Sequence, residues 1–178
     1  RAVNKIGKGN EYFSQKTIKA VKLIQNKKTV IFSNWFDFGL NPIKKILEEK
    51  KISNMTFSGE LSQREKKNIV DKFNNNEFKV LIISKSGSEG IDLKEVRNVI
   101  VMDPVWNHAG ILQIRGRAIR FMSHENLPLK ERHVNIYYMM LETGLKECKS
   151  GDTVVYDIIK QKRKNSEQID KALEKLSI

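Results

Sequence analysis

The segment 113–120 contains three arginines within six consecutive residues: Arg115, Arg117 and Arg120. Arginine keeps its charge and presents a rigid fork of donors that suits phosphate oxygens, so this density predicts a polyanionic ligand. In a helix, residues at i, i+3, i+4 and i+7 share one face, which here would carry Gln113, Gly116, Arg117 and Arg120. Such a face suits a triphosphate. The alternative for this segment is a basic helix that faces solvent and binds no ligand.

Small polar residues and glycines follow the apolar runs that we expect to be strands. They are Ser33 and Asn34, Ser58 and Gly59, and the segment that contains Ser84, Lys85, Gly90 and Asp92. Hydroxyls and glycines let backbone N–H groups approach a phosphate closely, and Lys85 adds a positive charge. One Ser-Gly corner is ordinary turn chemistry. Three such corners, followed by the arginines, favour a polyphosphate or nucleic-acid backbone lying across the strand ends.

Strands and helices alternate along the chain and must position these residues. Apolar runs rich in β-branched and aromatic residues predict strands over residues 29–33, 55–58, 79–84, 97–102 and 133–141. This alternation indicates an α/β fold with right-handed crossovers and an open parallel sheet of about five or more strands, with helices on both faces. Ligands of such sheets gather at the carboxyl ends of the strands, where the polar residues stand.

Four helical segments accompany the strands. We expect a helix over residues 11–28 that packs on a sheet edge, and a second one that follows the turn residues Gly39, Asn41 and Pro42. A capping box at Ser62–Glu65 begins a third helix, which ends near Asn74. Residues 152–178 predict two helices, or one with a break near residue 165; the first would return to pack on the sheet, and the second is amphipathic.

The composition limits the class of protein. At 178 residues and 39% apolar content, the chain is long enough for one globular domain. Thirty-three Lys and Arg against 21 Asp and Glu leave a net charge of +12, which favours a nucleic-acid partner. The single cysteine, Cys148, excludes an internal disulfide framework and a cysteine-based zinc site. The histidines lack metal-ligand spacing, so we expect no metal site.

No apolar run approaches the roughly 20 residues that span a bilayer, so we expect no membrane partner. The single cysteine favours a reducing intracellular setting. Because the chain begins at Arg1, we expect it to be a piece of a longer protein. We divide it into a lead-in with its helix over residues 1–28, a lobe over residues 29–150 and a helical extension over residues 151–178.

Five motifs in register give the chain a family resemblance. They are Phe32-Ser33-Asn34, Phe57-Ser58-Gly59, Ser84 to Leu93, Asp103-Pro104-Val105-Trp106-Asn107, and Gln113-x-x-Gly116-Arg117-x-x-Arg120. Together they resemble the C-terminal RecA-like lobe of superfamily 2 helicases, in the Swi/Snf-like branch. The stretch from Gly116 to His124 is similar to the helicase-like transcription ATPases of large cytoplasmic DNA viruses.

The resemblance implies that ATP with Mg²⁺ binds between two RecA-like lobes and that this lobe supplies the second wall. Arg120 matches the arginine finger, Arg117 its phosphate partner, and Gln113 the residue that positions the finger or reaches across the cleft. Gly90, Asp92 and Gly116 match the nucleotide-facing positions. The backbone of a DNA or RNA strand would be held by Ser33, Asn34, Ser58, Gly59, Ser84 and Lys85.

Two simpler roles remain open, since Asp92 also suits a turn cap and Gly116 suits close helix packing. The implied partners are nucleic acid, the N-terminal lobe and transcription machinery, in the virion or the host cytoplasm. The chain lacks a Walker A lysine and an Asp-Glu box, so we expect no ATP hydrolysis by this chain alone. A stand-alone basic α/β module that binds nucleic acid without ATP chemistry is the alternative function.

Overall fold

A computed structural model describes residues 14–84, 91–104, 116, 123–143 and 149–176 of the chain. Its centre is a five-stranded parallel sheet in the order β2-β3-β1-β4-β5. The strands are β1 (Thr29–Ser33), β2 (Asn54–Phe57), β3 (Val80–Ser84), β4 (Asn98–Val101) and β5 (Asn135–Tyr138). The predicted α/β architecture is therefore confirmed.

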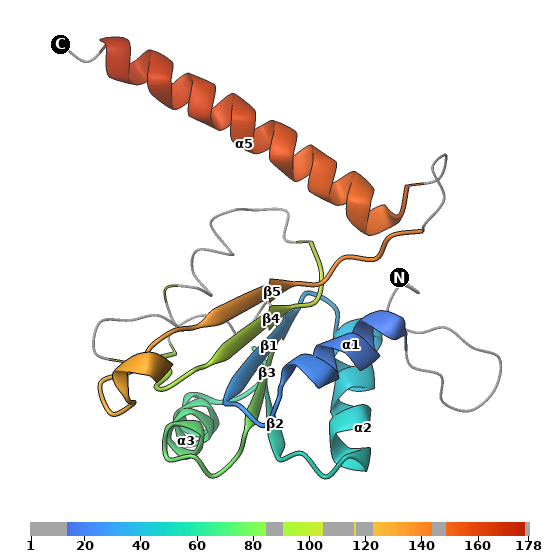
Figure 1. The fold of residues 1–178 in the computed structure, drawn as a ribbon, viewed down its shortest axis with the longest axis vertical. Helices are drawn as coiled ribbons and strands as arrows, with labels where there is room; N and C mark the ends of the chain where they lie inside the picture. Colours follow the sequence, from blue (N-terminus) through green and yellow to red (C-terminus); the bar gives the residue numbers. More distant parts are fainter. Residues whose placement is uncertain (1–13, 85–90, 105–115, 117–122, 144–148, 177–178) are drawn as a thin grey trace.

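Helices cover both faces of the sheet (Figure 1). On one face, α1 (Gln15–Leu23) and α2 (Asn41–Glu49) pack against the side chains of Ile31, Ile82 and Ile100. On the other face, α3 (Gln63–Asn74) packs against Phe32, Ile83 and Val101. Successive side chains of a strand point to opposite faces, so each apolar strand supplies both cores at once.

The first helix is shorter than predicted and lies elsewhere. The Ser14 side chain caps it by accepting from the Thr17 amide at 3.1 Å. After its C-cap Ile24, the chain turns through positive φ angles at Gln25 and Asn26. The helix lies on the sheet face beside α2, because Ala20, Val21 and Ile24 need an apolar surface to cover. Our placement at a sheet edge was wrong.

The segment between β1 and α2 is helical, which corrects our reading of it as a turn. A π-helix, η1 (Phe36–Leu40), leads directly into α2. Pro42 stands in the first turn of α2, where its missing N–H costs no helical hydrogen bond. Leu40 is buried, so the π-helical turn is held against the core.

The capping box of α3 is confirmed. Ser62 accepts from the Glu65 amide, and the Glu65 carboxylate accepts from the Ser62 amide. Hydrogen bonds from the Ser62 hydroxyl and amide hold the pKa of Glu65 below its ordinary value. The helix ends at Asn74, as the sequence predicted.

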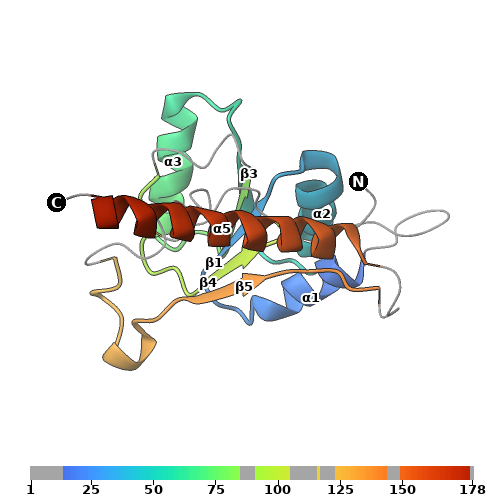
Figure 2. The same ribbon diagram turned by 90° about the horizontal axis from the view of Figure 1, so that it is seen from above.

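The C-terminal extension is one continuous helix, α5 (Gly151–Leu176), without a break near residue 165. It runs outside β5 and does not cover a face of the sheet (Figures 1 and 2). Val154, Tyr156 and Ile158 are exposed on it, so our prediction of a closing helix packed on the sheet was wrong. Its start is tied to α1 by a buried ion pair of 2.6 Å between Lys16 and Asp152.

Candidate functional site

Three of the predicted polar corners meet at one edge of the sheet, which we call the carboxyl edge because all strands end there. Ser33 of β1 pairs with Ser84 of β3, and Phe57 of β2 pairs with Ile83 of β3. Ser58 therefore follows its strand directly beside the end of β3. Parallel pairing thus brings together corners that are 51 residues apart along the chain, from Ser33 to Ser84.

Ser33 is fully buried and its hydroxyl is used inside the protein. It donates to the Oδ2 atom of Asp103 at 2.5 Å and accepts from the Trp35 amide at 3.1 Å. The same Asp103 oxygen accepts from the Asn34 amide at 3.1 Å. In this arrangement the Ser33 side chain shapes the edge and does not face solvent.

Asn34, Ser58 and Gly59 are half-buried at the carboxyl edge, and we call these three residues the edge track. The Lys66 ammonium donates to the Gly59 carbonyl at 3.3 Å, which places a positive charge beside the track. Ser84 is buried. The edge track is accessible to a ligand, with a lysine at one side that suits an anion.

Asp92 is exposed on the segment that follows β3, between the buried side chains of Ile91 and Leu93. Asn74 at the end of α3 fixes this segment: its amide donates to the Asp92 carbonyl at 3.0 Å, and its oxygen accepts from the Lys94 amide at 2.8 Å. The apolar neighbours anchor the backbone, so the carboxylate is directed outward. Its predicted role toward a ribose remains a prediction.

Gly116 is helical and exposed. A Cβ atom built on it would meet nothing within 4 Å, so the described structure gives no support to a role in close helix packing. Five other predicted site residues lie outside the described residues: Lys85, Gly90, Gln113, Arg117 and Arg120. Their roles stay predictions.

Sequence reasoning missed the importance of Gly39. A Cβ atom at this position would lie 2.0 Å from the Ser33 Oγ atom and 2.9 Å from its Cβ atom. Glycine is therefore required where η1 passes over the end of β1. The sequence signal was a glycine six residues after a buried serine, but nothing in a linear pattern shows that the two touch.

Sequence reasoning also missed three aromatic side chains that follow Asn34. Trp35, Phe36 and Phe38 are 48%, 48% and 40% exposed. We assigned them no role from the sequence, because they stand between the predicted strand over residues 29–33 and the helix expected after Pro42. Only the path of η1 shows that they face solvent.

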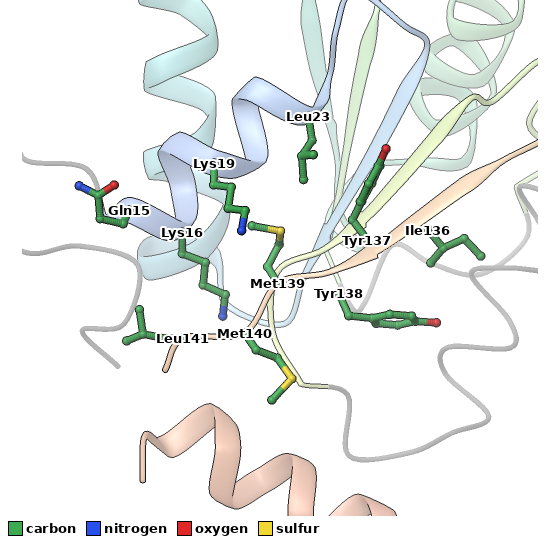
Figure 3. A pocket seen from close by; sticks show the side chains of 10 residues that line it. All are labelled: Gln15, Lys16, Lys19, Leu23, Ile136, Tyr137, Tyr138, Met139, Met140 and Leu141. Carbon is green, nitrogen blue, oxygen red and sulfur yellow. The ribbon is translucent and has the colours of Figure 1, made fainter. Parts of the chain in front are cut away.

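A separate cleft of about 480 Å³ lies between α1 on one side and β5 with the segment that follows it on the other (Figure 3). The side chains of Lys16 and Lys19 extend from α1 toward Met139 and Met140. The Lys16 ammonium is already paired with Asp152. None of the predicted site residues lines this cleft.

Within the described ranges, no group of three His, Cys, Asp or Glu side chains is placed to hold a metal ion. None of the helices in the same ranges has the length and hydropathy needed to cross a membrane.

The model of the helicase conserved C-terminal domain matches residues 14–122, which is more than half of the chain. The chain belongs to the helicase conserved C-terminal domain family. The match begins at the cap of α1 and extends through the arginine segment, so it includes all five motifs.

Viral proteins are among the relatives of this helicase C-terminal domain. Nucleoside triphosphatase I of Melanoplus sanguinipes entomopoxvirus is 32% identical over 174 residues, covering 93% of this chain and 27% of that protein. A protein of Acanthamoeba polyphaga mimivirus, named "Putative ATP-dependent RNA helicase", is 45% identical over 108 residues, covering 61% of this chain and 24% of that protein. The chain thus spans about a quarter of the length of these relatives.

Solved structures share the fold of the helicase C-terminal domain. The C-terminal part of the Fun30 ATPase domain superposes with a TM-score of 0.66 at 22% identity, covering 80% of this chain and 44% of that one. The helicase domain of Pyrococcus furiosus Hef gives a TM-score of 0.58 at 28% identity, covering 81% of this chain and 28% of that one. The resemblance to a helicase C-terminal RecA-like lobe is confirmed.

Proposed function

We propose that this helicase C-terminal domain is the second lobe of a nucleic-acid-dependent ATPase of a viral helicase or transcription factor. The observation that carries the proposal is the alignment of the ends of β2, β3 and β1 at the carboxyl edge. This alignment places the edge track beside the Lys66 ammonium in a chain of net charge +12. Phosphates are the anions that such an edge suits best.

The nucleic-acid strand lies along the edge track in this proposal. Asn34, Ser58 and Gly59 contact its phosphates, and the buried Ser33 supports the edge through Asp103. Lys85 completes the phosphate contacts predicted from the motifs, and the buried Ser84 supports the edge beside Ser33. Such contacts position a strand without reading its sequence, so binding should be nonspecific and should weaken steeply with salt.

ATP binds on the side of the arginine segment in this proposal. Arg120 acts as the finger that stabilises charge on the transferred phosphoryl group, with Arg117 on the phosphates and Gln113 positioning them. Gly90, Asp92 and Gly116 face the nucleotide, which agrees with the exposure of Asp92 and Gly116. The N-terminal lobe holds most of the ATP and the Mg²⁺, so this chain alone does not hydrolyse ATP.

The names of the relatives support this proposal. One relative is named a nucleoside triphosphatase and is similar over 93% of this chain, and another is named "Putative ATP-dependent RNA helicase" and is similar over 61% of it. The structure of Mss116p helicase domain 2, which shares the fold, contains an RNA duplex. We therefore propose DNA or RNA as a partner, with transcription machinery as a second partner in the infected cell.

The test is nucleic-acid-stimulated ATPase activity of the full-length protein that carries this chain. Arg120→Ala should lower the stimulated kcat by about 10³-fold or more, because a finger contributes about 10³ to 10⁵ in rate. Arg115→Ala is the matched control, since Arg115 lies outside the family pattern, and it should retain most of the activity. Undiminished turnover in Arg120→Ala would refute the assignment of Arg120 as the arginine finger. Nucleic-acid binding without any stimulated ATPase would favour the binding module instead.

A further inference from the structure

The four residues that follow Asn34 of the edge track are exposed, and three of them are aromatic. We call Trp35–Phe38 the aromatic turn. Its rings are between 40% and 48% exposed, while the chain on either side of it, at Ser33 and at Leu40, is buried. Single exposed apolar residues are ordinary, but several together mark a binding surface.

The backbone of the aromatic turn is firmly held, so the exposure of its rings does not come from a loose segment. The Trp35 amide donates to the Ser33 hydroxyl at 3.1 Å, and the Leu40 amide donates to the Trp35 carbonyl at 3.0 Å. Gly39 passes so close to Ser33 that a Cβ atom would clash. Short π-helical turns often occur at functional sites.

The aromatic turn continues directly from the edge track. Asn34 belongs to the track and Trp35 follows it, where the chain leaves β1 at the carboxyl edge toward α2 (Figure 1). A strand whose phosphates contact Asn34 therefore passes beside the aromatic rings. Bases carry the apolar faces that such rings bind, and each base that stacks on an aromatic side chain strengthens binding.

We propose that the aromatic turn is a stacking platform for unpaired bases of the nucleic-acid strand held on the edge track. The proposal rests on the proposed nucleic-acid function and names its substrate as single-stranded. Bases inside a duplex already stack on one another, so they cannot occupy the rings without unstacking. The platform therefore makes the lobe prefer a single strand to a duplex of the same length.

The surroundings of the aromatic turn favour a nucleic acid over a protein partner. Polar groups accompany its rings: Asn34 precedes the turn, and the Asp37 carboxylate within it accepts from the Asn41 side-chain amide at 3.2 Å. The chain as a whole carries +12, which attracts an anionic ligand and repels a basic one. A nucleic-acid strand supplies apolar bases and negative phosphates together.

The experiment measures binding of the 178-residue chain to three fluorescent probes of equal length: a single strand, the same strand with abasic sites throughout, and a duplex. The wild type should bind the single strand more tightly than the abasic strand, by roughly 5- to 150-fold for each stacked base. Replacing Trp35, Phe36 and Phe38 with Ala should remove this advantage. Affinity for the abasic strand and the salt dependence of binding should stay unchanged, because the phosphate contacts remain.

Two control variants keep the test decisive. Leu129→Ala removes another exposed apolar side chain, 81% exposed on the short helix η3 (Leu129–Glu131) that precedes β5, and should change nothing. Trp35→Phe keeps a ring at the first position of the turn and should retain most of the advantage. Circular dichroism and thermal melting confirm that each variant is folded.

Other outcomes would overturn the platform in distinguishable ways. Equal wild-type affinity for the single and abasic strands would refute base stacking. It would still agree with phosphate contacts at the edge track. An unchanged preference in the triple variant would place the base contacts elsewhere. If the wild type binds none of the probes, both the proposed nucleic-acid track and the stacking platform are refuted.

Discussion

The Ser33 hydroxyl donates to the Asp103 carboxylate at 2.5 Å and so joins the end of β1 to the residue that begins the Asp-Pro-x-Trp-Asn motif. The two residues are 70 positions apart in the sequence: Ser33 ends β1, and Asp103 follows the end of the neighbouring strand β4. The same carboxylate accepts from the Asn34 amide. One buried carboxylate therefore fixes the beginning of the edge track and the chain that leads to the arginine segment.

Removal of the Asp103 carboxylate should destabilise the domain. Asp103→Ala leaves the buried Ser33 hydroxyl and the Asn34 amide without this acceptor, and we expect a loss of about 2–4 kcal/mol in the free energy of unfolding. Asp103→Asn keeps an acceptor oxygen and should lose about 1 kcal/mol. Urea unfolding followed by circular dichroism measures both. Equal stability of Asp103→Ala and the wild type would show that the pair contributes nothing to the fold.

Lys28 should make stability depend on pH in the alkaline range. Burial lowers its pKa from 10.5 to about 8, although Glu95 raises it in part. The ammonium lies 4.7 Å from the centre of the Phe73 ring and donates to the Asn74 carbonyl at 3.3 Å. Because the native pKa is below the unfolded one, the charged amine opposes folding fully below pH 8. This opposition fades as the pH rises from 8 to 10.5.

Lys28→Met should therefore be more stable than the wild type at pH 7, by roughly 1 kcal/mol after allowance for partial solvent screening. The difference between the two proteins should shrink steadily between pH 8 and pH 10. Urea unfolding at several pH values measures it. Lys67→Met, at an exposed position of α3, is the control and should show a constant difference. A constant difference for Lys28→Met as well would contradict the lowered pKa.

The buried pair of Lys16 and Asp152 should anchor α5 to the domain. Lys16 is fully buried and the Asp152 carboxylate also accepts from the Leu141 amide at 2.9 Å. Lys16→Met leaves that carboxylate buried without its countercharge, and we expect a loss of about 3 kcal/mol. Adding Asp152→Asn removes the stranded charge and should restore part of the stability.

The exposed pair of Lys149 and Asp157 is the matched control for the buried one. It has the same separation of 2.6 Å, but its side chains are 64% and 49% exposed. Lys149→Met should therefore cost less than about 1 kcal/mol. The comparison is made by thermal or urea unfolding of the three variants and the wild type. A similar loss at the two pairs would mean that burial does not decide their contribution.

Local sequence patterns predicted most of the fold because they reflect short-range physics. β-branched apolar runs predicted all five strands to within a few residues, and a capping box predicted the start of α3. The position of α1 and the course of α5 were not predictable in this way. The apolar face of an amphipathic helix shows that this face will be buried. It does not show against which surface the helix packs.

The sequence by itself determined the family, the parallel sheet and the polar corners that follow its strands, because motif spacing and hydrophobic alternation are properties of the chain. Tertiary structure decided which of those corners face solvent. Ser33 is buried against Asp103 and Gly39, whereas Asn34 remains accessible and the aromatic turn is exposed. These differences arise from contacts between residues on different elements, and such contacts exist only after the strands have paired and η1 has passed over the end of β1.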